Sequence, residues 1–286
     1  MSQERAQRFL LELPAVRDDL PFSPALLTRL FRLTEEDGAS PLEAIAEAIA
    51  EDQGLSARVL GLANSAFYGL QAEVGNVARA VAVLGLREVR GLVLALGMRG
   101  LANVHPLPPG FVLSPYLEHQ LSVAVAAMEL ARETGVMDPD DAFTAGLLHD
   151  LGKLITALYR PDDWLAEAQL AAAQDLPWHE AEERHWGLDH GLIGAMVLAS
   201  WNLPPRLTEP VNWHHAPDAA PENPGPCRLL GLADACVHER TGEPLPDGDV
   251  ISPLAPGVGL RPDTAREATA SALAARNPGL LAAAIG

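Results

Sequence analysis

The chain has 286 residues, of which 48% are hydrophobic, and this is enough for one large or two modest domains with cores of their own. Its formal net charge of -18 repels phosphate backbones and anionic lipid, which argues against direct binding to nucleic acid or to a membrane. The apolar runs are too short to span a bilayer, and the N-terminus has no cleavage signal, so a cytoplasmic location is expected.

The sequence predicts an all-α protein. Ala, Leu, Glu and Arg fill amphipathic stretches, whereas the alternation typical of strands is rare and aromatic residues make up only 5% of the chain. In the first part of the chain we expect helices at about 2–12, 23–34, 41–51, 54–63, 76–84 and 86–101.

A Pro- and Gly-rich stretch at residues 103–115, NVHPLPPGFVLSP, indicates a boundary between two helical subdomains. Beyond it we expect helices at about 114–134, 139–158, 162–174, 178–184, 188–201, 205–215 and 226–240, then a loop-like stretch, and a last helix over 263–276. The predicted fold is a multi-helix bundle with subdomains at 1–104 and 105–245 and an extension at 246–286. The last helix could dock on the bundle or on another protomer.

The run TAGLLHDLGKLITAL, residues 144–158, places His149 and Asp150 side by side within an apolar helical pattern. Two titratable side chains in such a run are costly unless a metal ion, a hydrogen-bond network or a substrate satisfies them. Further imidazoles and a carboxylate occupy the starts, ends or apolar seams of other predicted helices: His119, His190, His214, His215 and Asp234. On adjacent helices these side chains could converge in the bundle core, as in dinuclear sites that suit iron, manganese or zinc.

A second interpretation of the same residues stays open, because buried histidines also hydrogen-bond to one another and to a carboxylate such as Asp234 without any metal. His179 and His185 are expected at the surface or the rim of the cleft, with a role as auxiliary ligand as the alternative. His105 and His238 are expected at the surface. The two cysteines, Cys227 and Cys236, are too few to build a zinc cage and are expected to be buried thiols.

The order H, HD, H, HH, D along the chain resembles the HD superfamily of metal-dependent phosphohydrolases. The N-terminal half resembles, within that superfamily, the HDOD (HD-related output domain) family of bacterial signalling proteins, through NSAFYG at 64–69 and AVAVLGLREVRGLVLALG at 80–97. The later segment WNLPPRLTEPVNWHHAPD matches the same family, and the resemblance extends to about residue 240. It implies an HD-domain-like C-terminal part. Asn64, Ser65 and Tyr68 form a polar group at a helix end, where we expect capping and subdomain docking.

HDOD proteins commonly lack metal ligands and serve as regulatory modules. This chain nevertheless has a residue at every position that corresponds to the dinuclear site of the related HD-GYP phosphodiesterases: His119, His149, Asp150, His190, His214, His215 and Asp234. Lys153 matches the lysine that those enzymes direct at a phosphate, but their Gly-Tyr-Pro motif is missing here. The resemblance implies a site for two divalent ions, and the choice among Fe, Mn and Zn stays open.

We favour a bacterial signal-transduction output module that acts through signalling protein partners, because the most specific resemblance lies in the N-terminal half, which adds no catalytic group. The alternative is a metal-dependent phosphohydrolase or phosphodiesterase acting on a small phosphate ester or cyclic dinucleotide, with Asp150 bridging the ions and Lys153 offsetting phosphoryl charge. The few cations near the site, Lys153, Arg160 and Arg206, argue against a nucleotide. A third interpretation is one half of a sensor system whose receiver or cyclase domain is carried by another protein.

Overall fold

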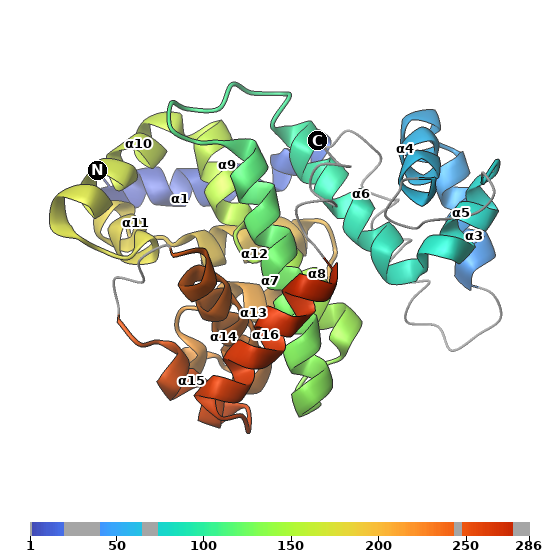
Figure 1. The fold of residues 1–286 in the computed structure, drawn as a ribbon. Helices are drawn as coiled ribbons and strands as arrows, with labels where there is room; N and C mark the ends of the chain where they lie inside the picture. Colours follow the sequence, from blue (N-terminus) through green and yellow to red (C-terminus); the bar gives the residue numbers. More distant parts are fainter. Residues whose placement is uncertain (1, 20–40, 65–73, 243–247, 277–286) are drawn as a thin grey trace.

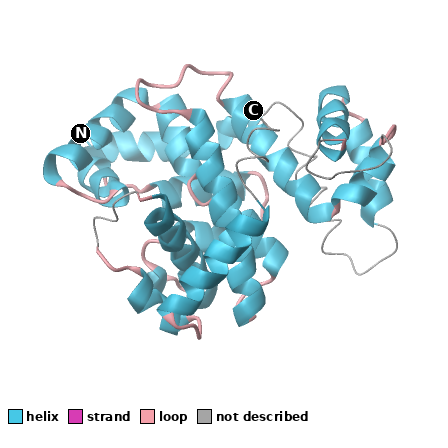
Figure 2. Cartoon of the chain, in the orientation of Figure 1, coloured by secondary structure: helices cyan, strands magenta, loops and turns pink. Residues whose placement is uncertain are grey.

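The computed structural model describes residues 2–19, 41–64, 74–242 and 248–276, and over these residues it contains helices and loops but no strand (Figure 2). The all-α fold predicted from the sequence is therefore confirmed. The expected helix at 23–34, and the residues Ser65 and Tyr68, lie outside the described residues. None of the described helices is both long and apolar enough to cross a bilayer.

The first two elements, α1 (Ser2–Glu12) and the 3-10 helix η1 (Leu13–Asp19), pack against α11 and α12 of the C-terminal part (Figure 1). The ring of Phe9 in α1 stacks on Trp186 of α11, with centroids 5.3 Å apart. The Tyr159 hydroxyl donates to a carboxylate oxygen of Asp19 at 2.6 Å. In space, residues 2–19 thus lie with the second predicted subdomain, residues 105–245. The subdomain boundaries themselves stay a prediction.

A small lobe consists of α3 (Pro41–Ala50), α4 (Gln53–Ala63) and α5 (Val77–Leu84), and α6 (Leu86–Leu101) leads from it to the larger bundle (Figure 1). Polar side chains define the helix ends. Asp52 caps α4 by accepting from the Leu55 amide at 2.9 Å. The Asn64 amide, at the end of α4, bonds both the N–H and the C=O of Val74, at 2.7 and 3.0 Å. Asn64 therefore ties the end of α4 to the chain that enters α5.

The larger bundle contains the remaining elements: α7 (Leu113–Thr134), α8 (Pro139–Leu148), α9 (Leu151–Tyr159), α10 (Pro161–Gln174), α11 (Trp178–Trp186), α12 (His190–Ser200), α13 (Pro205–Trp213), η2 (Pro217–Ala219), α14 (Pro224–Thr241), α15 (Ile251–Gly257) and α16 (Pro262–Arg276). At its centre, α7 packs against α8, α14 and α16 (Figure 1). Its side chains Leu121, Ala124 and Leu130 are completely buried. Burial of a leucine of this kind contributes about 1.5–3 kcal/mol to folding.

Three details differ from the sequence prediction or complete it. The helix expected over 139–158 is interrupted at His149 and Asp150, so that α8 and α9 are separate helices. The interruption arises because His149 Nδ1 donates to the Gly146 carbonyl at 2.8 Å, and Asp150 leaves helical geometry with φ -99° and ψ 14°. The loop-like stretch before residue 263 contains the short helix α15, and the terminal helix α16 docks on α7 and α14 of the same chain.

Candidate metal centre

The structure brings together all seven residues that the sequence predicted to be metal ligands. They come from five parts of the bundle: His119 in α7, His149 and Asp150 between α8 and α9, His190 at the start of α12, His214 and His215 just after α13, and Asp234 in α14. His149, His190 and His214 are buried, and so are the two aspartates.

Asp150 occupies the middle of this cluster. One carboxylate oxygen, Oδ2, lies 3.5 Å from His149 Nε2 and 3.9 Å from His119 Nε2. The other oxygen, Oδ1, lies 3.1 Å from His190 Nε2. The two oxygens of one carboxylate therefore face two different groups of imidazoles, as expected of a carboxylate that bridges two ions.

The first group lies between α7 and α14. Oδ1 of Asp234 is 3.1 Å from His119 Nε2 and 3.5 Å from His149 Nε2. The second group lies at the adjoining ends of α12 and α13, where His215 Nε2 and His190 Nε2 are 2.9 Å apart and the rings of His214 and His215 are 3.9 Å apart. The candidate ligand atoms of His190, His214 and His215 lie within 4.8 Å of one another, and so do those of His149, His214 and Asp234.

Two glycines allow the helices to approach closely enough to form the cluster. A Cβ on Gly152 would lie only 2.0 Å from the carbonyl oxygen of His190, and a Cβ on Gly231 would lie 2.3 Å from that of His214. Backbone contacts of this kind leave no room for any larger residue. The glycine two residues after Asp150 thus determines how near α9 and α12 lie, and hence the distance from Asp150 to His190.

Backbone carbonyls orient two of the imidazoles. Nδ1 of His149 bonds the Gly146 carbonyl at 2.8 Å, and Nδ1 of His214 bonds the Val211 carbonyl at 2.8 Å. With Nδ1 engaged, the Nε2 atom of each ring remains for the centre of the cluster.

Five buried ligand atoms have no hydrogen-bond partner among the described residues: Nε2 of His119, His149 and His214, and Oδ1 of Asp150 and Asp234. A buried polar atom without a partner costs about 1–3 kcal/mol, so a closed hydrogen-bond network would have to satisfy these atoms. The hydrogen bonds among the described residues leave these five atoms unsatisfied, although the atoms lie close together. Lone pairs from imidazole and carboxylate donors that converge in this way fit one or two divalent cations.

The electrostatics of the cluster also suit a cation. Burial opposes ionisation of Asp150, but His149 and Lys153 outweigh it and hold the pKa of Asp150 well below its ordinary value. Burial, together with His149, lowers the pKa of His214 to about 3. The aspartate is thus charged and this imidazole neutral, which are the protonation states that bind metal.

Lys153 is the only lysine in the chain, and its ammonium lies 2.7 Å from Oδ2 of Asp150. The two arginines expected near the site pair with other carboxylates. Arg160 bonds Asp163 at 3.0 Å, and Arg206 bonds Asp141 at 2.7 Å. Lys153 therefore contacts the cluster, whereas Arg160 and Arg206 bond carboxylates outside it.

The expectation that His238 lies at the surface is wrong. Its side chain is 20% exposed, Nε2 lies 3.3 Å from Oδ1 of Asp234, and its ring centroid is 4.6 Å from that of His119. The reason is helical spacing, since residues four apart in α14 share one face. The sequence carried this signal, because Asp234 and His238 both lie in the helix predicted over 226–240.

Sequence reasoning also missed Glu182, whose Oε2 lies 2.6 Å from His190 Nδ1. Burial lowers the pKa of His190, but Glu182 outweighs it and raises the value to about 10. Glu182 stands among other charged residues in WHEAEERHW, and nothing in that segment distinguishes it from Glu180 or Glu183.

The other histidines lie around the cluster or away from it. His179 stacks on His215 with centroids 4.2 Å apart, which places it at the rim as expected. His185 bonds Asp163 at 2.9 Å, and the half-exposed His105 lies 3.7 Å from Asp19. Among the described residues, neither His185 nor His105 forms a hydrogen bond or ion pair with a predicted ligand. The cysteines are free and buried, and burial raises the pKa of Cys227 to about 12 and that of Cys236 to about 11.

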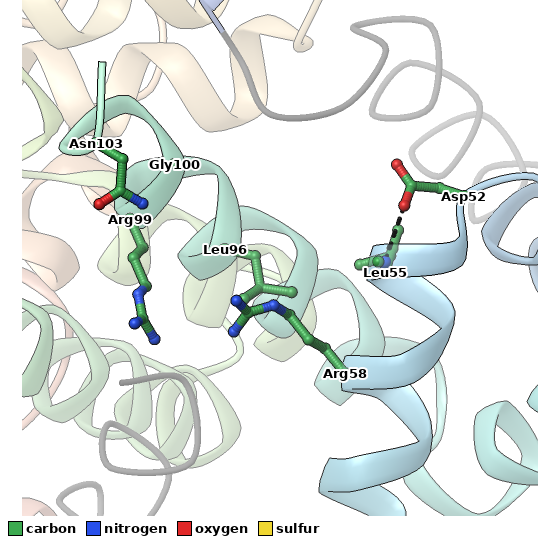
Figure 3. Close-up of a pocket in the computed structure, with 8 residues that line it drawn as sticks. Asp52, Leu55, Arg58, Leu96, Arg99, Gly100 and Asn103 are labelled. Carbon is green, nitrogen blue, oxygen red and sulfur yellow. Dashed lines mark hydrogen bonds between the residues drawn. The ribbon is translucent and has the colours of Figure 1, made fainter. Parts of the chain in front are cut away.

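Two pockets lie elsewhere in the described part of the chain. One, of about 200 Å³, lies between α4 and α6 and is lined by Asp52, Arg58, Arg99 and Asn103 among others (Figure 3). The second, of about 320 Å³, lies between α12 and α13 and is lined by Leu192, Met196 and Trp213 among others. None of the seven predicted ligands lines either pocket.

An all-helical bundle in which histidines and aspartates from separate helices converge defines a domain of the HD type. The family model of the HDOD domain matches residues 20–217. The chain therefore belongs to the HDOD family.

Several known proteins are similar to the chain. A protein from Shewanella amazonensis SB2B, whose name suggests a phosphohydrolase, is 27% identical, with 97% of this chain and 98% of that one covered and a TM-score of 0.72. A protein from Marinobacter aquaeolei VT8, whose name suggests signal transduction, is 24% identical, with 93% and 60% covered and a TM-score of 0.78. An uncharacterized protein of Treponema pallidum (strain Nichols) is 28% identical over 229 residues, which are 79% of this chain and 44% of that protein. The chain thus spans less than half the length of this curated relative.

Proposed function

We propose that this protein is a signal-transduction module of the HDOD type that holds divalent metal at its histidine–aspartate cluster and acts through protein partners. One observation carries the proposal: five buried ligand atoms converge and have no hydrogen-bond partner among the described residues. In a folded protein such atoms are satisfied, and divalent cations bound among them would satisfy them.

The ligands divide between two positions. His119, His149 and Asp234 would hold one ion, and His190, His214 and His215 would hold the other, with Asp150 between them. The five parts of the bundle that supply these ligands would then be joined at one point. Because the binding energy of a metal held by the folded state adds to its stability, an ion here would couple the metal to the packing of α7, α9, α12 and α14.

The surroundings of the cluster favour regulation over turnover. His149 and His190 are completely buried, and the ammonium of Lys153 is paired with Asp150. Arg160 and Arg206 face other carboxylates. A phosphorylated substrate would find few cations to bind it, whereas a metal that stabilises the helical surface needs none. The family membership and the similarity to a protein named for signal transduction support the same function.

The test is the metal content of the full chain, purified without chelators, by elemental mass spectrometry. We expect about one to two equivalents of iron, manganese or zinc in the wild type and a large loss in Asp150→Ala. Asp263→Ala is the matched control, because that carboxylate is 83% exposed and lies in α16, away from the cluster. Wild-type protein that stays free of these metals after anaerobic reconstitution would contradict the proposal.

A metal-dependent phosphohydrolase is the second candidate, and one observation favours it. The only lysine of the chain stands at the cluster, with 21% of its side chain exposed, where it could offset charge on a phosphoryl group. Bound divalent ions would supply Lewis acidity toward the phosphoryl oxygens. The similarity to a protein whose name suggests a phosphohydrolase supports this candidate.

The two candidate functions differ in whether the metal-loaded protein hydrolyses a phosphodiester. Metal-loaded full chain should be assayed with bis(p-nitrophenyl) phosphate beside Asp150→Ala and Lys153→Arg. Hydrolysis that both variants abolish would favour the enzyme. A loaded site without hydrolysis would favour the regulatory module.

A further inference from the structure

His238 lies one helical turn after Asp234 in α14 and points to the same place. Its Nε2 is 3.3 Å from Oδ1 of Asp234, and its ring centroid is 4.6 Å from that of His119. Only 20% of the His238 side chain is exposed, although the helix around it ends in the charged segment HERT. An i, i+4 pair of Asp and His presents two ligands from one face of a helix.

The distances from Oδ1 of Asp234 to the nearby imidazoles match those between two ligands of one ion. Donor atoms that bind one ion at about 2.0–2.2 Å lie roughly 3–3.5 Å from one another. Oδ1 of Asp234 lies 3.1 Å from His119 Nε2, 3.3 Å from His238 Nε2 and 3.5 Å from His149 Nε2. Three imidazole nitrogens therefore surround one carboxylate oxygen at first-ligand spacing.

We propose that His238 is a ligand of the ion held between α7 and α14, beside His119, His149 and Asp234. This inference rests on the metal binding of the proposed function and assigns a ligand that lies outside the H, HD, H, HH, D order.

The assignment changes what this ion can do. With Asp150 Oδ2 as the shared ligand, His119, His149 and Asp234 give this ion four protein donors, and His238 would be the fifth. Without His238, that fifth position would remain for water or substrate. His238 fills that position from the more exposed side of the cluster, where the side chains of His119 and Asp234 are 16% and 11% exposed. The ion between α7 and α14 would then hold helices together.

The alternative role for His238 is positioning, in which its Nε2 donates a hydrogen bond to Asp234 and orients that carboxylate without binding the ion. His238→Gln separates the two roles. The amide nitrogen of glutamine can replace Nε2 as a donor to the carboxylate, but glutamine supplies no imidazole to a metal.

The experiment is titration of the metal-free full chain with Co²⁺, followed by visible absorption, for wild type, His238→Ala and His238→Gln. The visible bands of Co²⁺ change in position and strength with the number and type of its ligands, so the spectrum reports the loss of an imidazole from the ion. We expect both variants to change the bands of one ion and to bind that ion at least about tenfold more weakly.

His105→Ala is the matched control, since His105 is also partly exposed and near an aspartate but lies outside the cluster. It should leave the spectrum and the affinity unchanged. Thermal melting of the metal-free proteins shows whether the variants fold.

Two results would overturn the assignment. A wild-type spectrum and affinity in His238→Ala would remove His238 from the site and leave the metal centre standing. Restoration by His238→Gln would make His238 a positioning residue for Asp234. If the wild type itself binds no Co²⁺, the metal centre of the proposed function fails together with this ligand.

Discussion

Glu182 holds His190 at two points. Oε2 of Glu182 lies 2.6 Å from His190 Nδ1 and accepts the His190 backbone N–H at 2.9 Å, while Oε1 accepts from Trp178 Nε1 at 2.8 Å. The carboxylate is buried, and it directs the far nitrogen of the His190 ring toward Asp150. A carboxylate in this place orients a metal-binding imidazole and increases its basicity.

Glu182→Ala should therefore weaken metal binding at the α12–α13 side of the cluster by about 10–100-fold. The measurement is competition between the full chain and a chelator of known affinity. Glu180→Ala in the same helix is the control, because Glu180 is paired with Arg184 at the surface. Equal affinities for Glu182→Ala and the wild type would show that His190 needs no such support.

Gly152→Ala should disrupt the cluster without removing a ligand. The new Cβ would meet the His190 carbonyl at 2.0 Å, so α9 and α12 must separate. Overpacking of this kind costs about 1–3 kcal/mol, and the shift should also reduce metal binding. Urea unfolding and metal content are the two measurements. Gly61→Ala, where a Cβ meets nothing within 4 Å in α4, should be neutral or stabilising by up to about 1 kcal/mol.

Glu167 predicts a pH dependence of stability. It is completely buried, neither carboxylate oxygen has a hydrogen-bond partner among the described residues, and burial together with Glu182 raises its pKa from 4.5 to about 9. Between these values the folded state binds a proton that the unfolded state releases. The free energy of unfolding therefore falls as pH rises, by at most about 1.4 kcal/mol per pH unit from this group.

Glu167→Gln keeps the shape and cannot ionise, so it should be more stable than the wild type at pH 8.5 and nearly equal at pH 5. The check is urea unfolding at several pH values in the presence of a chelator. Glu47→Gln, an exposed change in α3, serves as control. A difference between the wild type and Glu167→Gln that does not grow with pH would mean that Glu167 is ionised in the folded protein.

Lys153→Met should have opposite effects on the metal-free and metal-bound protein. Its ammonium lies 2.7 Å from Asp150, so its removal leaves a buried carboxylate without its cation and should destabilise the metal-free form by about 1–3 kcal/mol. A divalent ion would replace that charge, and without repulsion from the ammonium it should bind more tightly. Melting temperatures with chelator and with Mn²⁺ should differ more in Lys153→Met than in the wild type. A smaller difference would show that the ammonium does not compete with the ion.

Local patterns predicted most of the fold because they depend on neighbouring residues. The start of α8 at Asp138 and Pro139 follows from cap chemistry, and the structure has Asp138 accepting from the amides of Asp140 and Asp141. The interruption at His149 and Asp150 could not be predicted in this way, because the apolar periodicity continues unbroken through it. Helix α8 ends there, where the His149 side chain bonds the carbonyl of Gly146 and the Asp150 side chain lies against His190, which is distant in the chain.

The sequence by itself determined the helical class of this protein and the seven predicted ligands, because helix periodicity and the order of histidines and aspartates are properties of the chain. Only the tertiary structure decided which atoms meet. Glu182 of α11 reaches His190 at the start of the next helix, α12. His238 joins Asp234 and His119 because α14 packs against α7. Distances of a few ångströms between such helices depend on backbone contacts like that of Gly152 with His190, and no local pattern specifies these.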